Sequence, residues 1–227
     1  MASSGESASR AARLAGTLHL SLVPLGVFSF AYVPAVLIAR NDIAGTVQNI
    51  AGNQALFRSG IISHLLSQVI VVFLMMAIHR LFSPIDAART RLIVAMALVS
   101  VVISFVSELN QFAILSLLAD ASVDADGLQH QVRLLLELHR TSVLLAQIFW
   151  GLWLMITAFV ILSSRMLPRW LGVLLLAASA GYLFDSAAYL AGARIGSIAT
   201  LTFVGELTLP VWLLVKGVNG GENGYER

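Results

Sequence analysis

Residues 92–119 read LIVAMALVSVVISFVSELNQFAILSLLA, an almost unbroken apolar stretch with a carboxylate near its middle. About 20 apolar residues in a helix cross the roughly 30 Å hydrocarbon layer of a bilayer, so this stretch predicts a transmembrane helix. A carboxylate at the centre of such a helix costs roughly 2.5–3.5 kcal/mol. That cost is tolerated where the side chain faces other helices, a cavity or a partner charge. Glu108 therefore marks the place where a site is expected.

The composition of the whole chain is that of a polytopic membrane protein. The 227 residues are 58% hydrophobic and 11% charged, with a mean hydropathy of +0.87. Soluble domains carry about 25% charged residues. No clustered basic face is apparent, so nucleic acid is not an expected partner. The absence of cysteine excludes disulfides, thiolate metal ligands and a cysteine nucleophile.

The hydropathy pattern predicts an all-α fold with six transmembrane helices. The predicted spans are 14–39, 60–82, 92–119, 134–162, 170–190 and 197–215. Between the first two, Ile43, Val47 and Ile50 recur at helical spacing behind a potential N-cap, Asp42, which predicts a short helix on the membrane surface. We expect three regions: a disordered cytoplasmic tail at 1–13, one six-helix domain at 14–216 and a flexible cytoplasmic tail at 217–227.

Basic residues near the predicted membrane ends indicate the orientation. Six spans place both termini on one side, and cytoplasmic loops carry the excess of Lys and Arg. With both termini inside, the inner side holds nine basic residues: Arg10, Arg13, Arg80, Arg89, Arg91, Arg165, Arg169, Lys216 and Arg227. The outer side then holds five: Arg40, Arg58, Arg133, Arg140 and Arg194. This asymmetry predicts cytoplasmic termini.

A near-repeat links the third and sixth predicted spans. The letters FVSEL at 105–109 recur as FVGEL at 203–207, so each of these spans carries one buried glutamate. Halves of three spans each would be inverted relative to one another, an arrangement common in transporters. Four matching letters are a weak signal in apolar sequence. They suggest a 3+3 inverted repeat and single out Glu206 beside Glu108.

Several short runs resemble a known family. They are FRSGIISHLLSQ (57–68), SELNQ (107–111), LELH (136–139), AQIFWGLW (146–153), LPRWLGVLL (167–175), GYLFDS (181–186) and GELTLPVWLLVKGV (205–218). In this order they resemble a bacterial multi-pass integral membrane family catalogued only as a domain of unknown function (number 4386). The resemblance implies a helical protein of the bacterial cytoplasmic (inner) membrane, and it implies no activity. Gln147 stands where the family pattern has an acid.

Polar side chains from five predicted spans share the same half of the membrane. At a rise of about 1.5 Å per residue they gather in the outer half, which predicts a polar pocket reached from outside. The candidates for ligand binding or proton handling are Glu108, Glu206, Asp185, His64, His139, Arg140, Gln68, Gln111 and Gln147. No residue is assigned a catalytic role. Without an HxxxH or HExxH spacing, no metal site and no cofactor are predicted.

The charges within this set suggest how it is neutralised. Arg140 is the nearby full positive charge, and Asp185 lies at its predicted depth, so we expect these two to pair. Glu108 and Glu206 are then expected to share one pocket, with at least one of them protonated at neutral pH. Pro210 removes the usual hydrogen-bond donor to the carbonyl of Glu206, and that oxygen must find another donor or line a cavity.

Three functions fit these observations. The first is binding or transport of a small or lipophilic ligand, with membrane lipid as the surrounding partner. The second is an intramembrane enzyme in which a buried Glu or Asp acts as general acid on a lipophilic substrate. The third is a structural or assembly protein whose polar groups bond one another and bind no ligand.

Overall fold

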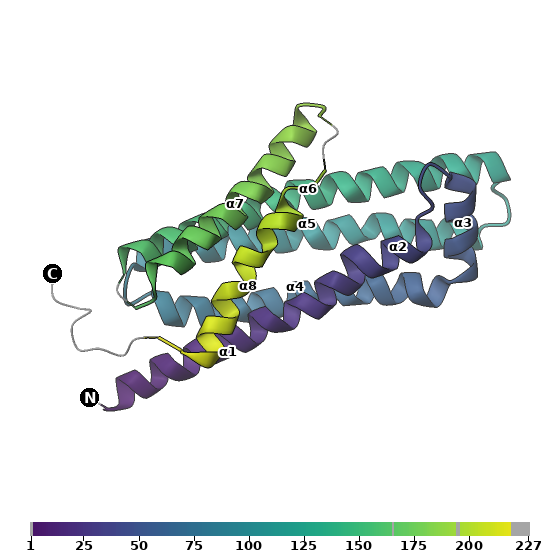
Figure 1. Ribbon diagram of the computed structural model, residues 1–227. Helices are drawn as coiled ribbons and strands as arrows, with labels where there is room; N and C mark the ends of the chain where they lie inside the picture. The colour runs from purple at the N-terminus through teal and green to yellow at the C-terminus, as the bar shows by residue number, and fades with distance from the viewer. Residues whose placement is uncertain (1, 165, 194–195, 219–227) are drawn as a thin grey trace. The chain divides into compact units, whose positions relative to one another are not determined.

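The fold is all-α, as predicted, throughout the residues that the computed structural model describes, which are 2–164, 166–193 and 196–218. No strand occurs in these ranges. The elements are α1 (Ala2–Gly26), the π-helix η1 (Val27–Tyr32), α2 (Val33–Leu37), α3 (Ile43–Gly52), α4 (Gln54–Phe82), α5 (Ala87–Ala119), α6 (Ala125–Ser163), α7 (Arg169–Leu190) and α8 (Ala199–Val215). Figure 1 labels the α-helices.

Within the described residues, five stretches of helix are long and apolar enough to cross a membrane. They are Ala8–Leu37, Gln54–Phe82, Ala87–Ala119, Ala125–Ser163 and Arg169–Leu190. The chain is therefore a multi-pass membrane protein. The sixth predicted span corresponds to α8, an apolar helix of 17 residues. At 1.5 Å per residue it is about 26 Å long, slightly less than the hydrocarbon thickness. Six crossings remain a prediction.

The first span begins earlier than expected and contains an irregular turn. α1 starts at Ala2 and includes the segment that we expected to be a disordered tail, and Ala12 within it is fully buried. Further along, η1 lies between Pro24 and Pro34. The N–H of Val33 donates to the carbonyl of Phe28, five residues back, which is the π-helical pattern. Such turns are rare and frequently lie at functional sites.

Contacts divide the chain into two compact units. The central unit consists of Leu22–Val69 and Val102–Val143. The terminal unit consists of Met1–Ser21, Ile70–Val101 and Leu144–Arg227. The division passes through four helices, α1, α4, α5 and α6, so each of them contributes one part to each unit.

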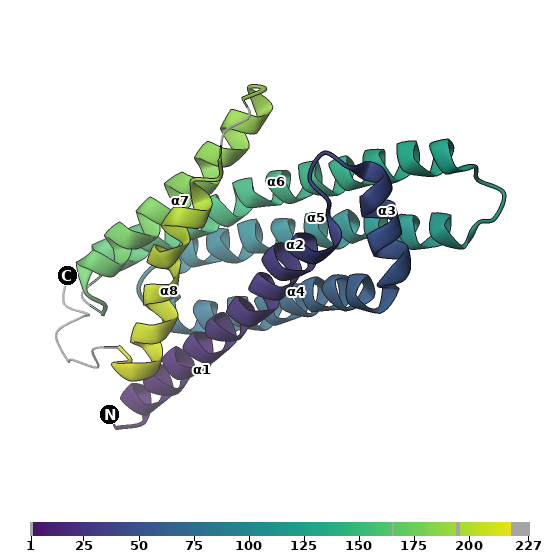
Figure 2. The ribbon, with the colours of Figure 1, turned by 45° about the vertical axis from the view of Figure 1, so that its right-hand side comes forward.

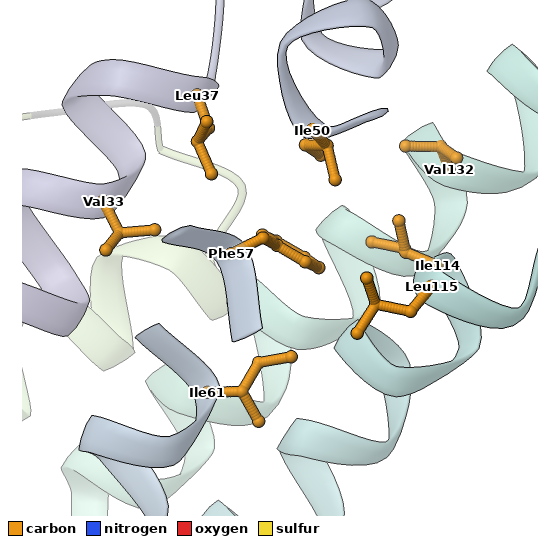
Figure 3. Close-up of a cluster of buried hydrophobic side chains, with 8 residues drawn as sticks. All are labelled: Val33, Leu37, Ile50, Phe57, Ile61, Ile114, Leu115 and Val132. Atoms are coloured by element: carbon orange, nitrogen blue, oxygen red, sulfur yellow. The ribbon is translucent and has the colours of Figure 1, made fainter. Parts of the chain in front are cut away.

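The central unit has an apolar core to which five helices contribute. Figure 3 shows the ring of Phe57 in the middle of this core, pointing toward Ile114 and Leu115. The core consists of Val33, Leu37, Ile50, Phe57, Ile61, Ile114, Leu115 and Val132, and each of these side chains is at most 6% exposed. The buried neighbours of each side chain make this region a close-packed core.

The short helix α3 packs on this core, and its predicted position at the membrane surface stays a prediction. It runs across the direction of α4 in Figures 1 and 2, and its residues Thr46 and Ile50 are buried. The predicted N-cap is confirmed, because the carboxylate of Asp42 accepts a hydrogen bond of 2.8 Å from the N–H of Gly45. α3 therefore covers one end of the central unit.

In the terminal unit, glycines allow helices to approach closely. A methyl group added at Gly205 would lie 2.5 Å from the carbonyl oxygen of Leu174, so α8 meets the backbone of α7 there. A methyl group added at Gly181 would meet the side chain of Thr202 and the backbone of Ala199, so α7 and α8 are also close together there. Small residues at helix contacts are the usual basis of membrane helix packing.

The connection between α5 and α6 is shorter than the acidic connector that we predicted. It covers 120–124, and α6 begins at Ala125. Asp124 accepts a hydrogen bond from the N–H of Gly127, as expected of turn chemistry. Hydrogen bonds from the hydroxyl and N–H of Ser122 hold the pKa of Asp120 below its usual range. Three residues used in the orientation argument, Arg165, Arg194 and Arg227, lie outside the described residues, as does most of the predicted C-terminal tail.

Candidate functional site

Glu108 lies in the central unit between two histidines from neighbouring helices. Its side chain, on α5, is 1% exposed. One carboxylate oxygen, Oε1, is 2.5 Å from Nδ1 of His64 on α4. The same oxygen is 3.8 Å from Nδ1 of His139 on α6. We call Glu108, His64 and His139 the Glu108 cluster. A histidine beside a buried carboxylate can take up a proton and neutralise it, so the cluster has a source of positive charge within it.

His139 is held by two further residues of α5. The hydroxyl of Ser107 is 2.9 Å from Nδ1 of His139, and the side-chain amide of Gln111 is 2.9 Å from Nε2. When the amide donates to Nε2, the proton of a neutral imidazole lies on Nδ1, the nitrogen that faces Ser107 and Glu108. Ser107 and Gln111 are one helical turn apart, so a single face of α5 fixes the ring orientation.

Four buried polar atoms around this cluster have no hydrogen-bond partner among the described residues. They are Nε2 of His64, Oε2 of Glu108, Oε1 of Gln68 and Oγ of Ser104. All four residues are at most 4% exposed. Leaving such an atom unpaired costs about 1–3 kcal/mol. Groups of this kind in a native protein are normally satisfied by ordered water or a ligand.

The helix register brings these four atoms into two adjacent layers. α4 and α5 are joined by a short turn, and His64 contacts Glu108 across them. Gln68 lies four residues after His64, and Ser104 lies four residues before Glu108. Because α4 and α5 run in opposite directions, Gln68 and Ser104 are both displaced from the His64–Glu108 contact toward the same end of the two helices. They therefore face each other one helical turn from that contact.

The π-helix contacts this cluster through one aromatic ring. The ring of Phe30 meets that of His64 edge to face, with centroids 4.7 Å apart. Beside it, the hydroxyl of Ser63 donates to the carbonyl of Leu25 at 3.1 Å. The irregular turn therefore packs directly on a polar, buried site, which is where π-helices are frequently found.

A second carboxylate cluster lies in the terminal unit around Glu206 on α8. Its Oε1 is 3.1 Å from Nε2 of His19 on α1, and the hydroxyl of Tyr182 on α7 donates to its Oε2 at 2.9 Å. Trp153 and Trp150 on α6 lie beside His19 and Tyr182, in each case with ring centroids 6.0 Å apart. We call Glu206, His19 and Tyr182 the Glu206 cluster. Both oxygens of its carboxyl group are occupied.

Gln147 lies at the level of this second cluster. Ser186 on α7 donates to the carbonyl of Leu144, and Ser179 donates to that of Gly151, so α6 and α7 run antiparallel in a fixed register. That register sets Gln147 opposite the turn of α7 that contains Tyr182. The Oε1 atom of Gln147 is buried and has no hydrogen-bond partner in the described parts of the chain.

Asp185 is held by groups at the start of α8. Its carboxylate accepts hydrogen bonds from the hydroxyl of Ser197 and from the backbone N–H groups of Ile198 and Ala199. Ser197 precedes α8 and the two N–H groups belong to its beginning, so Asp185 caps that helix from α7. The guanidinium of Arg140 lies 3.9 Å from Glu137 on the same helix, and the pairing of Arg140 with Asp185 stays a prediction.

The structure thus groups the predicted site residues in two sets. It brings together Glu108, His64, His139, Gln68 and Gln111, and it separately places Glu206 and Gln147 in the terminal unit. A pocket shared by Glu108 and Glu206 stays a prediction. His19, Tyr182 and Ser104 are site residues that were not predicted from the sequence. Ser104 lies four residues before Glu108, on the same face of α5, and this spacing was the available signal for Ser104. No sequence spacing links His19 to Glu206, because 187 residues separate them.

Two other features of the described residues do not form part of either cluster. No group of three or more His, Asp or Glu side chains among them is arranged to hold a metal ion. A groove of about 470 Å³ lies between the end of α5 and the start of α6 and is lined by Ala113, Ser116, Leu117, Asp120, Gln131, Leu134 and Leu135. Leu117 follows Glu108 by nine residues, which is two and a half helical turns. The groove therefore opens on the side of α5 opposite to Glu108.

Comparisons with known proteins identify the family. The family described as "Domain of unknown function (DUF4386)" matches residues 14–217, a range that contains all residues of both clusters. An uncharacterized protein of Archaeoglobus fulgidus is 37% identical over 73 residues, which are 32% of this chain and 44% of that protein. The match therefore spans less than half of this archaeal relative. No solved structure matches. Because the family covers nearly the whole chain, this protein belongs to the DUF4386 family of multi-pass membrane proteins.

Proposed function

We propose that this membrane protein binds a small or lipophilic ligand through the Glu108 cluster. The observation that supports the proposal is the set of four buried, unpartnered atoms on His64, Glu108, Gln68 and Ser104. Their combined cost of several kcal/mol is avoided when a bound group supplies the missing hydrogen bonds.

The atoms define the kind of group that would bind. Oε1 of Gln68 is an acceptor, whereas the hydroxyl of Ser104 both donates and accepts. Oε2 of Glu108 and Nε2 of His64 accept or donate according to where the shared proton lies. A hydroxyl or amide group matches this mixture because it both donates and accepts hydrogen bonds. An amine group matches it as a donor.

Replacing Glu108 by glutamine is expected to remove most of the bound ligand. The change keeps the shape of the side chain but abolishes the charge, and hydrogen bonds to charged groups contribute about 1.5–3 kcal/mol. At 1.4 kcal/mol per tenfold, the affinity should fall about 10- to 100-fold. The measurement is mass spectrometry of small molecules and lipids that co-purify with the protein in mild detergent, normalised to the amount of protein.

The matched control is Glu137→Gln, which removes a carboxylate whose side chain is 55% exposed on the outside of α6. It should retain the full complement of bound molecules. Equal amounts of every co-purified species in the wild type, Glu108→Gln and Glu137→Gln would contradict the proposal. Thermal stability of each variant is recorded in parallel, so loss of ligand can be separated from loss of fold.

An intramembrane enzyme is the second candidate function. It is supported by Oε2 of Glu108, which is buried and unpartnered while Oε1 contacts His64. A carboxyl group in this arrangement can donate a proton to a bound substrate, and the imidazole can restore it. Incubation of the purified protein with a lipid extract would reveal new products if this function holds. Loss of the products in Glu108→Gln but not in Glu137→Gln would assign the activity to the cluster.

We also propose six membrane crossings with both termini in the cytoplasm of a bacterial cell, based on the basic residues near the membrane ends. The chain has no cysteine, so single cysteines can be introduced and probed in intact cells with an impermeant thiol reagent. Asp124→Cys, outside, should be labelled, and Ala88→Cys, inside, should react only after lysis. Labelling of Ala88→Cys alone in intact cells would reverse the orientation.

A further inference from the structure

We propose that the Glu206 cluster is a proton-binding site and the repeat-related counterpart of the Glu108 cluster. His19 is the group that takes up the proton, Glu206 stabilises it, and Tyr182 tunes the carboxylate. The proposal goes beyond ligand binding at Glu108 and does not depend on it, because it rests on contacts within the terminal unit.

The two clusters have the same pattern of helix contacts. If the chain is divided into halves of three apolar helices each, Glu108 and Glu206 both lie on the third helix of their half. Each is hydrogen-bonded by the second helix of its own half, through His64 on α4 or Tyr182 on α7.

The first helices complete the pattern. Each glutamate is also approached by a histidine from the first helix of the other half. His139 on α6 lies 3.8 Å from Glu108, and His19 on α1 lies 3.1 Å from Glu206. If the first three apolar helices are exchanged with the last three, the helices that contact Glu108 become the helices that contact Glu206. A repeat of three helices predicts this correspondence, and together with the FV-x-EL letters it is hard to obtain by chance.

The chemistry of the Glu206 cluster suits a single proton. Without the added proton the pair consists of a carboxylate and a neutral imidazole, with a net charge of −1. Binding of one proton to the imidazole of His19 gives an imidazolium and a carboxylate, with a net charge of zero. A buried neutral pair of this kind costs less in a membrane than the uncompensated carboxylate.

The groups around the pair favour this assignment. The titratable side chains that the described contacts bring to Glu206 are His19 and Tyr182, with Asp185 one turn further along α7 and already bonded to the start of α8. From α6 the neighbours are neutral, namely Trp153, Trp150 and the amide of Gln147. No Lys or Arg side chain is among these contacts, so His19 is the group available to neutralise Glu206.

The backbone of α8 provides a second reason for a special environment. Pro210 lies within α8 and has no N–H, so the carbonyl of Glu206 loses its usual helical donor. At the same level Gly16 lets α1 approach closely, because a methyl group there would be 2.9 Å from the carbonyl oxygen of Pro210. This close approach sets His19, one turn further along α1, within reach of the carboxylate.

The test is a titration of the histidine side chains by nitrogen NMR. The protein is labelled with nitrogen-15 in its five histidines, and the signal of His19 is assigned by its loss in His19→Asn. Spectra are recorded from about pH 4 to about pH 9, the range in which carboxyl and imidazole groups titrate. In the wild type the His19 signal should change from imidazolium to imidazole within this range.

Two variants test the roles of the partners. Glu206→Gln removes the stabilising anion, so the proton affinity of His19 should fall about tenfold or more. Tyr182→Phe removes the donor that spreads the negative charge of Glu206, so the carboxylate holds the proton on His19 more strongly and the midpoint should move to higher pH. A merely structural role for Tyr182 would change stability and leave the midpoint in place.

Matched controls are His79→Asn, on an exposed position of α4, and Tyr32→Phe, whose ring is 53% exposed. Neither should alter the titration of His19. A His19 signal that stays neutral throughout the range, or one whose midpoint is the same in Glu206→Gln as in the wild type, would overturn the proposal. Ligand co-purification at the Glu108 cluster is measured separately, so failure of either proposal is recognised independently.

Discussion

Phe57→Ala should lower the free energy of unfolding by about 3 kcal/mol. Phe57 is 3% exposed and lies in the middle of the apolar core, against side chains from α5 (Figure 3). Removal of its ring would leave a cavity that five helices share and cannot easily close. In a membrane protein the unfolded side chain remains partly in an apolar surrounding, so we expect the lower end of the usual 3–5 kcal/mol.

The measurement is unfolding of the protein in mixed micelles by increasing denaturing detergent. The matched control is Phe112→Ala, the same substitution on α5 at a position that is 43% exposed. It should change the stability by less than about 1 kcal/mol, because the ring already faces the surroundings. Similar losses for both variants would mean that the core around Phe57 does not hold the unit together.

The same core also positions the Glu108 cluster. Phe57 precedes His64 by seven residues, or two helical turns, and Val132 precedes His139 by the same number. Packing of these residues fixes α4 and α6 against α5 about 10 Å from the cluster. Both histidines reach the carboxylate of Glu108 because the spacing of the three helices is set there. Phe57→Ala should therefore also reduce ligand binding.

Much of the fold can be predicted from hydropathy, because apolar runs of membrane length have few alternatives. The ends of the helices are predicted less well. α6 begins at Ala125, nine residues before the predicted span, and α4 begins at Gln54, six residues before. Hydropathy identifies the segment that suits lipid, whereas a helix continues into water wherever its backbone hydrogen bonds can form.

The candidate site could be predicted only in part. Glu108 stands out from its energetic cost, and His64 and Gln68 lie one turn apart on a single helix face. The partners of the acids are harder to predict than the acids themselves. Backbone N–H groups hold Asp185, and histidines lie beside the two glutamates. Such pairings depend on which helices become neighbours, and single-helix patterns do not contain that information.

Single and double substitutions of His64 and Glu108 test whether the Glu108 cluster serves ligand binding or the stability of the fold. His64→Leu or Glu108→Leu alone should lower the free energy of unfolding by about 3–5 kcal/mol, because either change leaves the other group buried without its partner. The double variant should regain most of that stability. Two leucines fill a similar volume, and replacement of a buried polar pair by apolar residues is often neutral or stabilising by about 1–4 kcal/mol.

The combination of stability and binding decides between a functional and a structural role. If the cluster is kept for function, the double variant should be about as stable as the wild type and should have lost the ligand. A double variant whose losses simply add, to more than about 6 kcal/mol, would favour the structural role and contradict the proposed function. The exposed pair of Glu137 and Arg140 provides the control cycle, in which leucine at both positions should reveal a coupling below about 1 kcal/mol. Unfolding in mixed micelles supplies the energies, and mass spectrometry of the same preparations supplies the bound ligand. A stable, ligand-free double variant would thus show that these two buried polar residues cost the fold stability and are retained for what they bind.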